Sequence, residues 1–169
     1  VDRDRPNRRN FYPLCLSRPI YALRSGLVTL RERLVRRVGA EAAEVAAFIP
    51  EYLVDTTRVR EGGPVNDPAS LHGRDLLLLD CRLKPESLEM IDRRGPSACF
   101  CDAGGEVLAV WLREADSERV DRTSIGSLFE SARMRLPTRN AVRLPHWQYT
   151  WDLVLQNAEL IRADFCDLG

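Results

Sequence analysis

The stretch "DLLLLD", from Asp75 to Asp80, constrains the fold more than any other part of this chain of 169 residues. Its four consecutive leucines have the length of a strand, and an aspartate bounds them on each side. A strand with one exposed face alternates apolar and polar residues, whereas a strand covered on both faces, as in a parallel sheet, is apolar throughout. The run therefore predicts a buried strand in a layered α/β sheet.

Helix and strand patterns alternate on either side of this run. Leu27, Leu30, Leu34 and Val38 predict one face of a helix that ends at Gly39. The segments that follow are predicted as a buried strand over 43–49 and a helix with Pro50 in its first turn that ends at residues 62–63. The predicted class is α/β with strands and helices in alternation.

The second half of the chain predicts a hairpin and three helices. "SACFCDAGGEVLAVWL" has two apolar segments joined by a turn at residues 102–105, and places Cys99 and Cys101 on one face. The helices are expected over 85–95, over 124–136 and over 147–165. The residues expected to face the core are Ile125, Leu128 and Phe129 in the second of these helices, and Trp151, Val154, Leu155, Ala158 and Ile161 in the third.

Composition indicates one globular domain and excludes several classes. Hydrophobic residues make up 44% and charged residues 30%, and 25 basic residues balance 25 acidic ones. A protein that coats nucleic acid usually has a basic excess, so no nucleic-acid partner is expected. No segment has the length of a membrane span, so no membrane partner is expected, and the polar first nine residues, expected to form an arm, contain no signal sequence.

The cysteines and the basic residues narrow the chemistry. Five cysteines without a CxxC pair or a nearby histidine predict neither a zinc site nor a disulfide scaffold, and we expect a reducing, cytoplasmic compartment. Lys84 is the only lysine among the basic residues. A cation that binds phosphate or carboxylate in this protein is therefore expected to be an arginine, which binds such groups as a planar fork.

The first candidate site lies in "LSRPIYALRSG". Arg18 precedes a proline and is therefore not expected in a helix, and Arg24 precedes Ser25 and Gly26 at the predicted helix start. Free N–H groups at a helix start bind anions, so two guanidiniums there would form a phosphate clamp. The alternative is that both arginines are solvated or pair with carboxylates.

The second candidate is Asp80, directly after the predicted buried strand. Ligands of open α/β folds bind at the carboxyl ends of the strands, and an aspartate there can hold Mg²⁺. Arg82, two residues further on, is expected on the same side. The alternative is an aspartate that caps a turn. Asn66 and Asp67 are a third candidate, for which turn formation before a proline is a sufficient explanation.

Four ordered segments resemble one bacterial family. They are "NFYPLCLSRPIYALRSGLVTLRERL", "PEYLVDTTRVREGGPVND", "LLLLDCRLKP" and "TWDLVLQNAELIRADF", and they extend over residues 10–165. The chain is similar to bacterial sugar nucleotidyltransferases that form the N-terminal part of alternative UDP-N-acetylglucosamine diphosphorylase/glucosamine-1-phosphate acetyltransferases. The resemblance implies a Rossmann-like nucleotide-diphospho-sugar transferase fold with a mixed sheet.

This resemblance also implies a reaction. A sugar 1-phosphate would attack the α-phosphate of UTP or another nucleoside triphosphate and release pyrophosphate, with Mg²⁺ as cofactor. Arg18 and Arg24 would be the catalytic cations, Asp80 the metal ligand, and Ser25, Gly26, Asn66, Asp67 and Arg82 the substrate-binding residues. Such domains usually continue into a left-handed β-helix acyltransferase, which is therefore a possible fused or separate partner, and a homo-oligomer is possible.

The chain departs from ordinary sugar nucleotidyltransferases at several positions. They carry a Pro-Lys pair six residues before a glycine, whereas this chain has Arg18-Pro19 before Gly26 and no lysine in this segment. "DRDRPNRRN" replaces their Gly-rich loop. Two functions follow: an active nucleotidyltransferase whose arginines replace the lysine, or a catalytically degenerate module that binds nucleotide sugars or serves regulation and assembly beside an acyltransferase.

Overall fold

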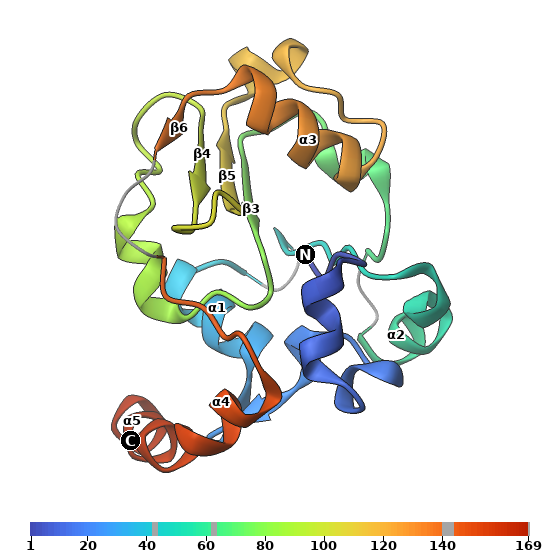
Figure 1. Cartoon of the computed structure of the whole chain (residues 1–169). Helices are drawn as coiled ribbons and strands as arrows, with labels where there is room; N and C mark the ends of the chain where they lie inside the picture. The colour runs from blue at the N-terminus through green and yellow to red at the C-terminus, as the bar shows by residue number, and fades with distance from the viewer. Residues whose placement is uncertain (42–43, 62–63, 140–143, 169) are drawn as a thin grey trace.

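The leucine run forms strand β3, Leu76–Leu79, at the edge of a four-stranded mixed sheet (Figure 1). The structure, a computed structural model, describes residues 1–41, 44–61, 64–139 and 144–168. The strand order is β3-β5-β4-β6, with β4 at Ala98–Cys101, β5 at Val107–Leu112 and β6 at Thr138–Arg139. β3 and β4 run antiparallel to β5, and β6 runs parallel to β4.

The predicted burial of the leucine run is confirmed in part. The prediction that its neighbouring strand runs parallel to it is wrong, because β5 runs antiparallel. Leu76 and Leu78 are buried, whereas Leu77 and Leu79 are half-buried. β3 and β4 point in the same direction, but β5 lies between them and pairs with both. The neighbour of β3 in this sheet is therefore antiparallel.

The β4–β5 hairpin is confirmed, and so is the shared face of its two cysteines. The carboxylate of Asp102 accepts hydrogen bonds from the N–H groups of Gly104 (2.9 Å) and Glu106 (2.8 Å), which closes the turn. Cys99 and Cys101 are buried in the same apolar cluster. The bonds to Asp102 thus hold the turn, and the buried cysteines anchor β4 in the core.

One helix covers one face of the sheet, and a second reaches the apolar cluster on the other side. Helix α3, Ile125–Arg135, packs on one face through Leu128 and Phe129, and these predicted core residues are confirmed. Helix α1, Leu30–Val38, reaches the cluster on the other face through Leu34. The α/β class with a mixed sheet and an antiparallel hairpin is confirmed.

Helix α1 begins later than its apolar spacing predicts. Thr29 caps it by accepting a hydrogen bond from the N–H of Glu32, whose carboxylate bonds back to the N–H of Thr29, and Gly39 ends it in the left-handed conformation. Leu27 is exposed and lies in the turn between β1, Arg24–Ser25, and β2, Val28–Thr29. This capping box fixes the start three residues after Leu27.

Two further predicted elements take other forms. Residues 44–49 form no strand: Ala47 makes a single parallel bridge to Val65. The helix predicted over 85–95 is a 3₁₀ helix, Pro85–Met90. Helix α2, Val54–Glu61, is confirmed after a 3₁₀ turn at Glu51–Leu53, and its predicted end at residues 62–63 lies outside the described residues. Further 3₁₀ helices in the described part of the chain are Pro6–Phe11 (η1), Leu14–Leu16, Ile20–Ala22, Pro68–Leu71 and Glu114–Arg119.

The last predicted helix is two helices, and its predicted inner face is wrong. Helix α4 is Thr150–Leu155 and α5 is Asn157–Leu168; they lie at one end of the molecule, away from the sheet (Figure 1). Trp151, Val154 and Leu155 are 55%, 69% and 76% exposed. Leu153 and Asp164 are buried instead. The helices rest on the β1–β2 region by the opposite face.

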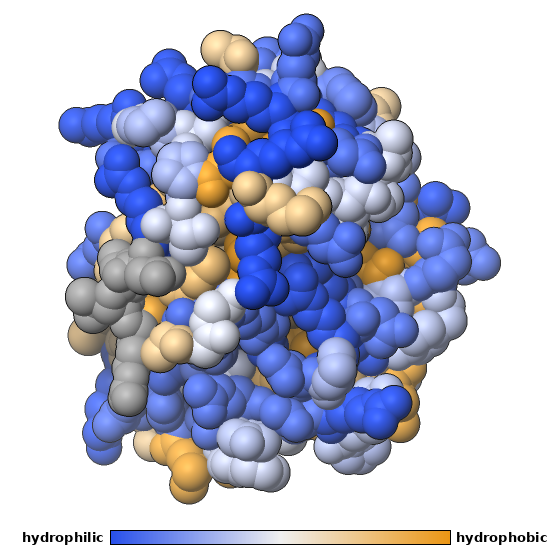
Figure 2. All heavy atoms as spheres, turned by 45° about the horizontal axis from the view of Figure 1, so that its top comes forward, coloured by the Kyte–Doolittle hydropathy of each residue, from blue (hydrophilic) through white to orange (hydrophobic). Residues whose placement is uncertain are grey.

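Residues 1–9 belong to the folded domain and do not form a separate arm. Asp2 and Arg8 are buried, and η1 begins within this segment. The outer surface is mostly hydrophilic on the face seen in Figure 2, with hydrophobic atoms in recesses and at the rim. No helix among the described residues is long and apolar enough to span a membrane.

Candidate functional site

Asp80 follows β3 directly and lies at the centre of a cluster of charged side chains. Its Oδ1 accepts hydrogen bonds from Arg82 Nε (2.9 Å) and from the backbone N–H of Arg82 (3.0 Å). Its Oδ2 accepts from Arg82 Nη2 (3.2 Å) and from Arg3 Nη2 (3.3 Å). Both oxygens of this buried carboxylate are therefore bound by guanidiniums.

Glu106, directly before β5, extends the cluster. Its carboxylate accepts from Arg82 Nη2 (2.7 Å), from Arg5 Nη1 (3.2 Å) and from Asn7 Nδ2 (2.9 Å). We define the Asp80 cluster as Arg3, Arg5, Asp80, Arg82 and Glu106. Three guanidiniums face two carboxylates in it, so it carries one excess positive charge, which favours an anionic ligand.

Burial and charge act in opposite directions on Arg82. Burial alone would lower its pKa, but the neighbouring carboxylates of Asp80 and Glu106 raise the pKa above the ordinary value for arginine. The guanidinium therefore stays charged at any pH at which the protein is folded.

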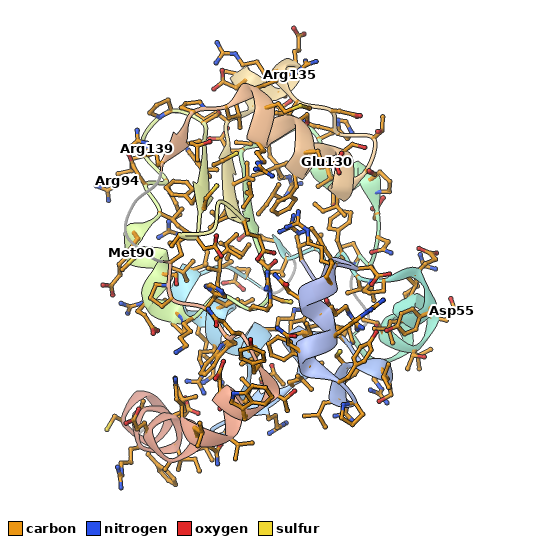
Figure 3. The ribbon with its side chains drawn as sticks, in the orientation of Figure 1. Asp55, Met90, Arg94, Glu130, Arg135 and Arg139 are labelled. Carbon is orange, nitrogen blue, oxygen red and sulfur yellow. The ribbon has the colours of Figure 1, made fainter. Side chains whose placement is uncertain are left out.

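Arg3 is the cation of the cluster with unused donors. Its guanidinium lies over the ring of Phe129, 3.8 Å from the centroid, and its Nη2 donates to the carbonyl oxygen of Val107 (2.7 Å). Its Nε and Nη1 are buried and have no hydrogen-bond partner among the described residues. In Figure 3, nitrogen-tipped side chains gather between η1 and α3, at the end of the sheet nearer η1. Both atoms are buried, and the cavity that Arg3 lines measures about 10 Å³, which is room for a water molecule and not for a phosphate unless the side chain moves.

A second buried ion pair joins this cluster to the segment that contains Arg18. Asp2 accepts from Arg8 Nε (3.1 Å), and its other oxygen accepts from the N–H of Ile20 (2.8 Å). Arg8 also donates to the carbonyl oxygen of Cys15 (2.6 Å). Arg18 itself is exposed, and none of the bonds among the described residues involves its guanidinium. Its side chain is available to a ligand.

The loop of Arg24, Ser25 and Gly26 is not a helix start, which corrects the sequence prediction. These residues form β1 and the turn that follows, and Gly26 has a φ of 78°. The exposed Arg24 donates to the carbonyl oxygen of Leu27 (3.0 Å), and the buried Ser25 donates to that of Leu153 (2.7 Å). α4 and α5 therefore hold this loop in place.

The backbone donors expected to bind phosphate in this loop are bound by side chains of α5. The N–H of Gly26 donates to Asn157 Oδ1 (2.7 Å), and the N–H of Leu27 donates to Asp164 Oδ2 (2.8 Å). Arg33 of α1 holds the same carboxylate through two bonds, at 2.6 and 2.8 Å. The carboxylate of Asp164 thus occupies an anion-binding turn.

Asn66 and Asp67 have the turn roles that their sequence alone explains. Asn66 has a φ of 51°, and its amide bonds to the N–H of Ile49 (2.8 Å) and to the carbonyl oxygen of Ile49 (2.9 Å). Asp67 caps the 3₁₀ helix Pro68–Leu71 by accepting from the N–H of Ala69 (3.0 Å). Among the described residues, neither Asn66 nor Asp67 makes a hydrogen bond or ion pair with the Asp80 cluster.

The structure therefore joins some candidate residues and leaves others apart. Asp80 and Arg82 are in contact, whereas Arg24, Ser25 and Gly26 form a separate loop that contacts α4 and α5. Sequence reasoning missed Arg3, Arg5 and Glu106, which come from the presumed arm and from the residue after the hairpin turn. The clustering of arginines before residue 10 was the signal that could have identified the first two.

The comparison with known proteins agrees with this arrangement. A family model described as sugar nucleotidyl transferase matches residues 3–168, from the first arginine of the Asp80 cluster to the end of α5. The structure is an α/β protein with an arginine-rich cluster at the end of β3, and the family match supports a nucleotidyltransferase role in general. The chain belongs to the sugar nucleotidyl transferase family. No curated protein and no solved structure matches it.

Proposed function

We propose that the protein forms a nucleotide sugar and pyrophosphate from a nucleoside triphosphate and a sugar 1-phosphate. The observation that carries the proposal is the Asp80 cluster, which has one excess positive charge in a chain of this family. UTP and N-acetylglucosamine 1-phosphate are the first substrate pair to test, because the sequence resembles UDP-N-acetylglucosamine diphosphorylases.

The reaction requires charge stabilisation at one phosphorus atom. A phosphate oxygen of the sugar 1-phosphate forms a bond to the α-phosphorus, and the bond from that phosphorus to the oxygen bridging the α- and β-phosphates breaks, so pyrophosphate leaves with the electron pair. Arg5 is at the rim of the cluster and partly exposed, so it can bind phosphate oxygens, whereas the unused donors of Arg3 are buried and become available only if its side chain moves. Arg18 is exposed and would supply a further cation.

The Asp80 cluster does not fit a magnesium ion held by protein side chains alone. Arg82 and Arg3 bind both oxygens of Asp80, and the described residues include no group of three or more metal-ligating side chains. Mg²⁺ commonly binds one or two carboxylates together with the phosphates of a substrate. A metal role for Asp80 would therefore require Arg3 or Arg82 to leave its carboxylate.

A second function has its own supporting observation. Asp80 and Arg82 neutralise each other, and α5 side chains take the backbone donors of the Gly26 loop. This arrangement favours a domain that binds a nucleotide sugar without turning it over, beside an acyltransferase partner or in a homo-oligomer.

Pyrophosphate release separates the two functions. The protein is incubated with Mg²⁺, each of the common nucleoside triphosphates and several sugar 1-phosphates, and thermal stabilisation by each nucleotide is measured in parallel. Turnover with one pair supports the enzyme, whereas stabilisation without turnover supports the binding module. Absence of both results would contradict nucleotide binding. The Arg94→Ala variant should give the same results as the native protein, because Arg94 is exposed and lies at the periphery of the molecule (Figure 3).

A further inference from the structure

Tyr149 and Trp151 stack their rings beside the Asp80 cluster's neighbour η1, where helix α4 begins. The ring centroids are 4.3 Å apart, and the two ring planes are 9° from parallel. Trp151 is 55% exposed although Tyr149 covers one face of its indole, so the exposed part includes the opposite face. Flat aromatic rings stack favourably in parallel, offset arrangements. The exposed face of Trp151 is therefore a surface on which another flat ring can lie.

The chain on both sides of this ring pair is fixed. Trp147 and Leu153 are buried in the same apolar cluster, one before and one after the pair. The N–H of Tyr149 donates to Asp152 Oδ2 (2.9 Å), which fixes the start of the helix. Trp151 thus lies between two anchored residues. A ligand that stacks on it loses little affinity to the ordering of this segment.

The 3₁₀ helix η1 joins the ring pair to the Asp80 cluster. In its first half, Asn7 Nδ2 donates to the carboxylate of Glu106 (2.9 Å), which belongs to the cluster. In its second half, the carbonyl oxygen of Asn10 accepts from Thr150 Oγ1 (3.1 Å), directly before Trp151. Asn7 and Asn10 are three residues apart, which is about 6 Å along a 3₁₀ helix. In Figure 1, η1 (dark blue) runs from the level of the sheet toward the end of the molecule that holds α4.

This spacing suits a nucleoside triphosphate. Arg5 binds the same carboxylate as Asn7, is partly exposed and can bind phosphate oxygens. In a nucleotide, one ribose separates the base from the phosphates, and this separation is comparable with the one turn of η1 between the cluster and the ring pair. Every nucleobase has a π-face that can stack on an aromatic side chain. Phosphate at Arg5 therefore leaves the base within reach of Trp151.

We propose that Trp151 binds the base of the nucleoside triphosphate, which stacks on the exposed face of the indole while Arg5 binds phosphate oxygens. The inference rests on the nucleotide substrate of the proposed function. Tyr149 supports the indole from its other face. Because all bases have a π-face, this contact raises the affinity for nucleotides without selecting among bases.

Tryptophan fluorescence reports on this contact. The chain has three tryptophans, and Trp147 is buried and Trp111 half-buried, so Trp151 is the exposed one. The nucleoside triphosphate that binds best, with UTP tested first, should quench the emission of the native protein, and Trp151→Phe should abolish this quenching. Inorganic triphosphate, which has no base, should not quench. Equal quenching by inorganic triphosphate would overturn the proposal, and so would quenching that persists in Trp151→Phe.

A sugar on the indole is the alternative that the same titration separates. Quenching by N-acetylglucosamine 1-phosphate alone, without quenching by the nucleotide, would assign the ring of Trp151 to the sugar and would overturn the proposal. Quenching by the nucleotide in the absence of any sugar phosphate supports it.

Isothermal titration with the same nucleotide measures the contribution of the ring. Trp151→Leu should raise the Kd about tenfold, which is the loss of one base–aromatic stack. Trp151→Phe keeps an aromatic ring and should change the Kd by less than about threefold. Phe165→Leu is the matched control, because it removes another exposed ring, on α5, and should leave the Kd unchanged. Both side chains are exposed, so the variants should keep the native thermal midpoint.

The outcomes separate this inference from the proposed function. An unchanged Kd in Trp151→Leu would overturn the role of Trp151 and leave the proposed function intact. An equal loss of affinity in Phe165→Leu would also overturn it, because the effect would then not be specific to the ring pair. A native protein that binds none of the common nucleoside triphosphates would overturn both.

Discussion

Arg33 holds Asp164 by two parallel hydrogen bonds, from Nη1 to Oδ1 at 2.6 Å and from Nη2 to Oδ2 at 2.8 Å. The pair is buried, and it joins helix α1 to the last helix of the domain. The same carboxylate accepts the N–H of Leu27, so one aspartate fixes the Gly26 loop relative to both helices.

Asp164→Asn should lower the free energy of unfolding by about 3 kcal/mol, because Arg33 would remain as a buried charge without its counterion. Urea denaturation measures the change. Asp92→Asn is the control, since Asp92 is exposed and pairs with Arg139 at 3.7 Å; it should leave the urea midpoint unchanged. An equal shift in both variants would contradict the structural role of Asp164.

The contribution of Asp164 should also depend on pH. Burial alone would raise its pKa, but the hydrogen bonds from Arg33 and from the N–H of Leu27 hold the pKa below the ordinary value of 3.8. A carboxylate whose pKa is lower in the folded than in the unfolded state stabilises the fold at pH values above its unfolded-state pKa. This stabilisation is lost as the pH falls through the folded-state pKa. The difference in urea midpoint between the native protein and Asp164→Asn should therefore shrink below about pH 4. A difference that persists unchanged at about pH 2 would contradict this account.

Gly26→Ala should destabilise the protein more than Gly39→Ala does. Both glycines have a positive φ, 78° and 75°, so both variants carry the cost of a side chain in the left-handed region, about 1 kcal/mol. A Cβ at Gly26 would lie 2.3 Å from Asp164 Oδ2, whereas a Cβ at Gly39 meets nothing within 4 Å. Thermal unfolding of the two variants isolates the effect of displacing Asp164. Equal midpoints would show that the carboxylate moves away without cost.

Arg18→Ala should weaken nucleotide binding by about tenfold, because one charge-assisted hydrogen bond is lost, whereas Arg24→Ala should weaken it less, because Arg24 lies in a separate loop and donates to the carbonyl oxygen of Leu27. Both arginines are exposed, so the free energy of unfolding should change by less than about 0.5 kcal/mol. Isothermal titration with UTP and urea denaturation provide the two measurements, with Arg94→Ala as the matched control. An arginine whose removal unfolds the domain is structural, and its role as a phosphate ligand would be wrong.

One of the five cysteines should react rapidly with a thiol reagent in the native protein. Cys166 is exposed, whereas Cys15, Cys81, Cys99 and Cys101 are buried. Burial raises the pKa of the Cys99 thiol to about 12 and also raises that of Cys81, so their thiolates are scarce at neutral pH. Labelling followed by mass spectrometry measures the number of labelled cysteines before and after unfolding. Fast labelling of Cys99 without denaturant would contradict its position in the core.

Local pattern predicted those elements whose partners are close in the sequence. The hairpin over residues 102–105 was predictable because its turn and its two strands are adjacent, and α3 was predictable because both its cap and its apolar spacing are local. In contrast, the spacing of Trp151, Val154 and Leu155 shows that these residues share one helical face. Spacing does not show whether another element covers that face. Among the described residues, no element covers it, and each of these three side chains is more than half exposed.

The candidate site was predictable in part for the same reason. Asp80 and Arg82 are two residues apart, so their contact follows from the end of one strand. The contacts of Asp80 with Arg3 and of Leu27 with Asp164 join residues separated by 77 and 137 positions. No local pattern encodes such partners, because they depend on how the whole chain packs.

The bond from Leu27 to Asp164 has a consequence for the order in which the domain is completed during translation. The second residue of the β1–β2 turn is synthesised early, but its carboxylate partner comes from the last helix. Since domains fold as units while the ribosome adds about 5–20 residues per second, a nascent chain that stops before position 164 cannot form this bond. The β1–β2 turn therefore gains its link to the last helix only after almost all of the domain has been synthesised.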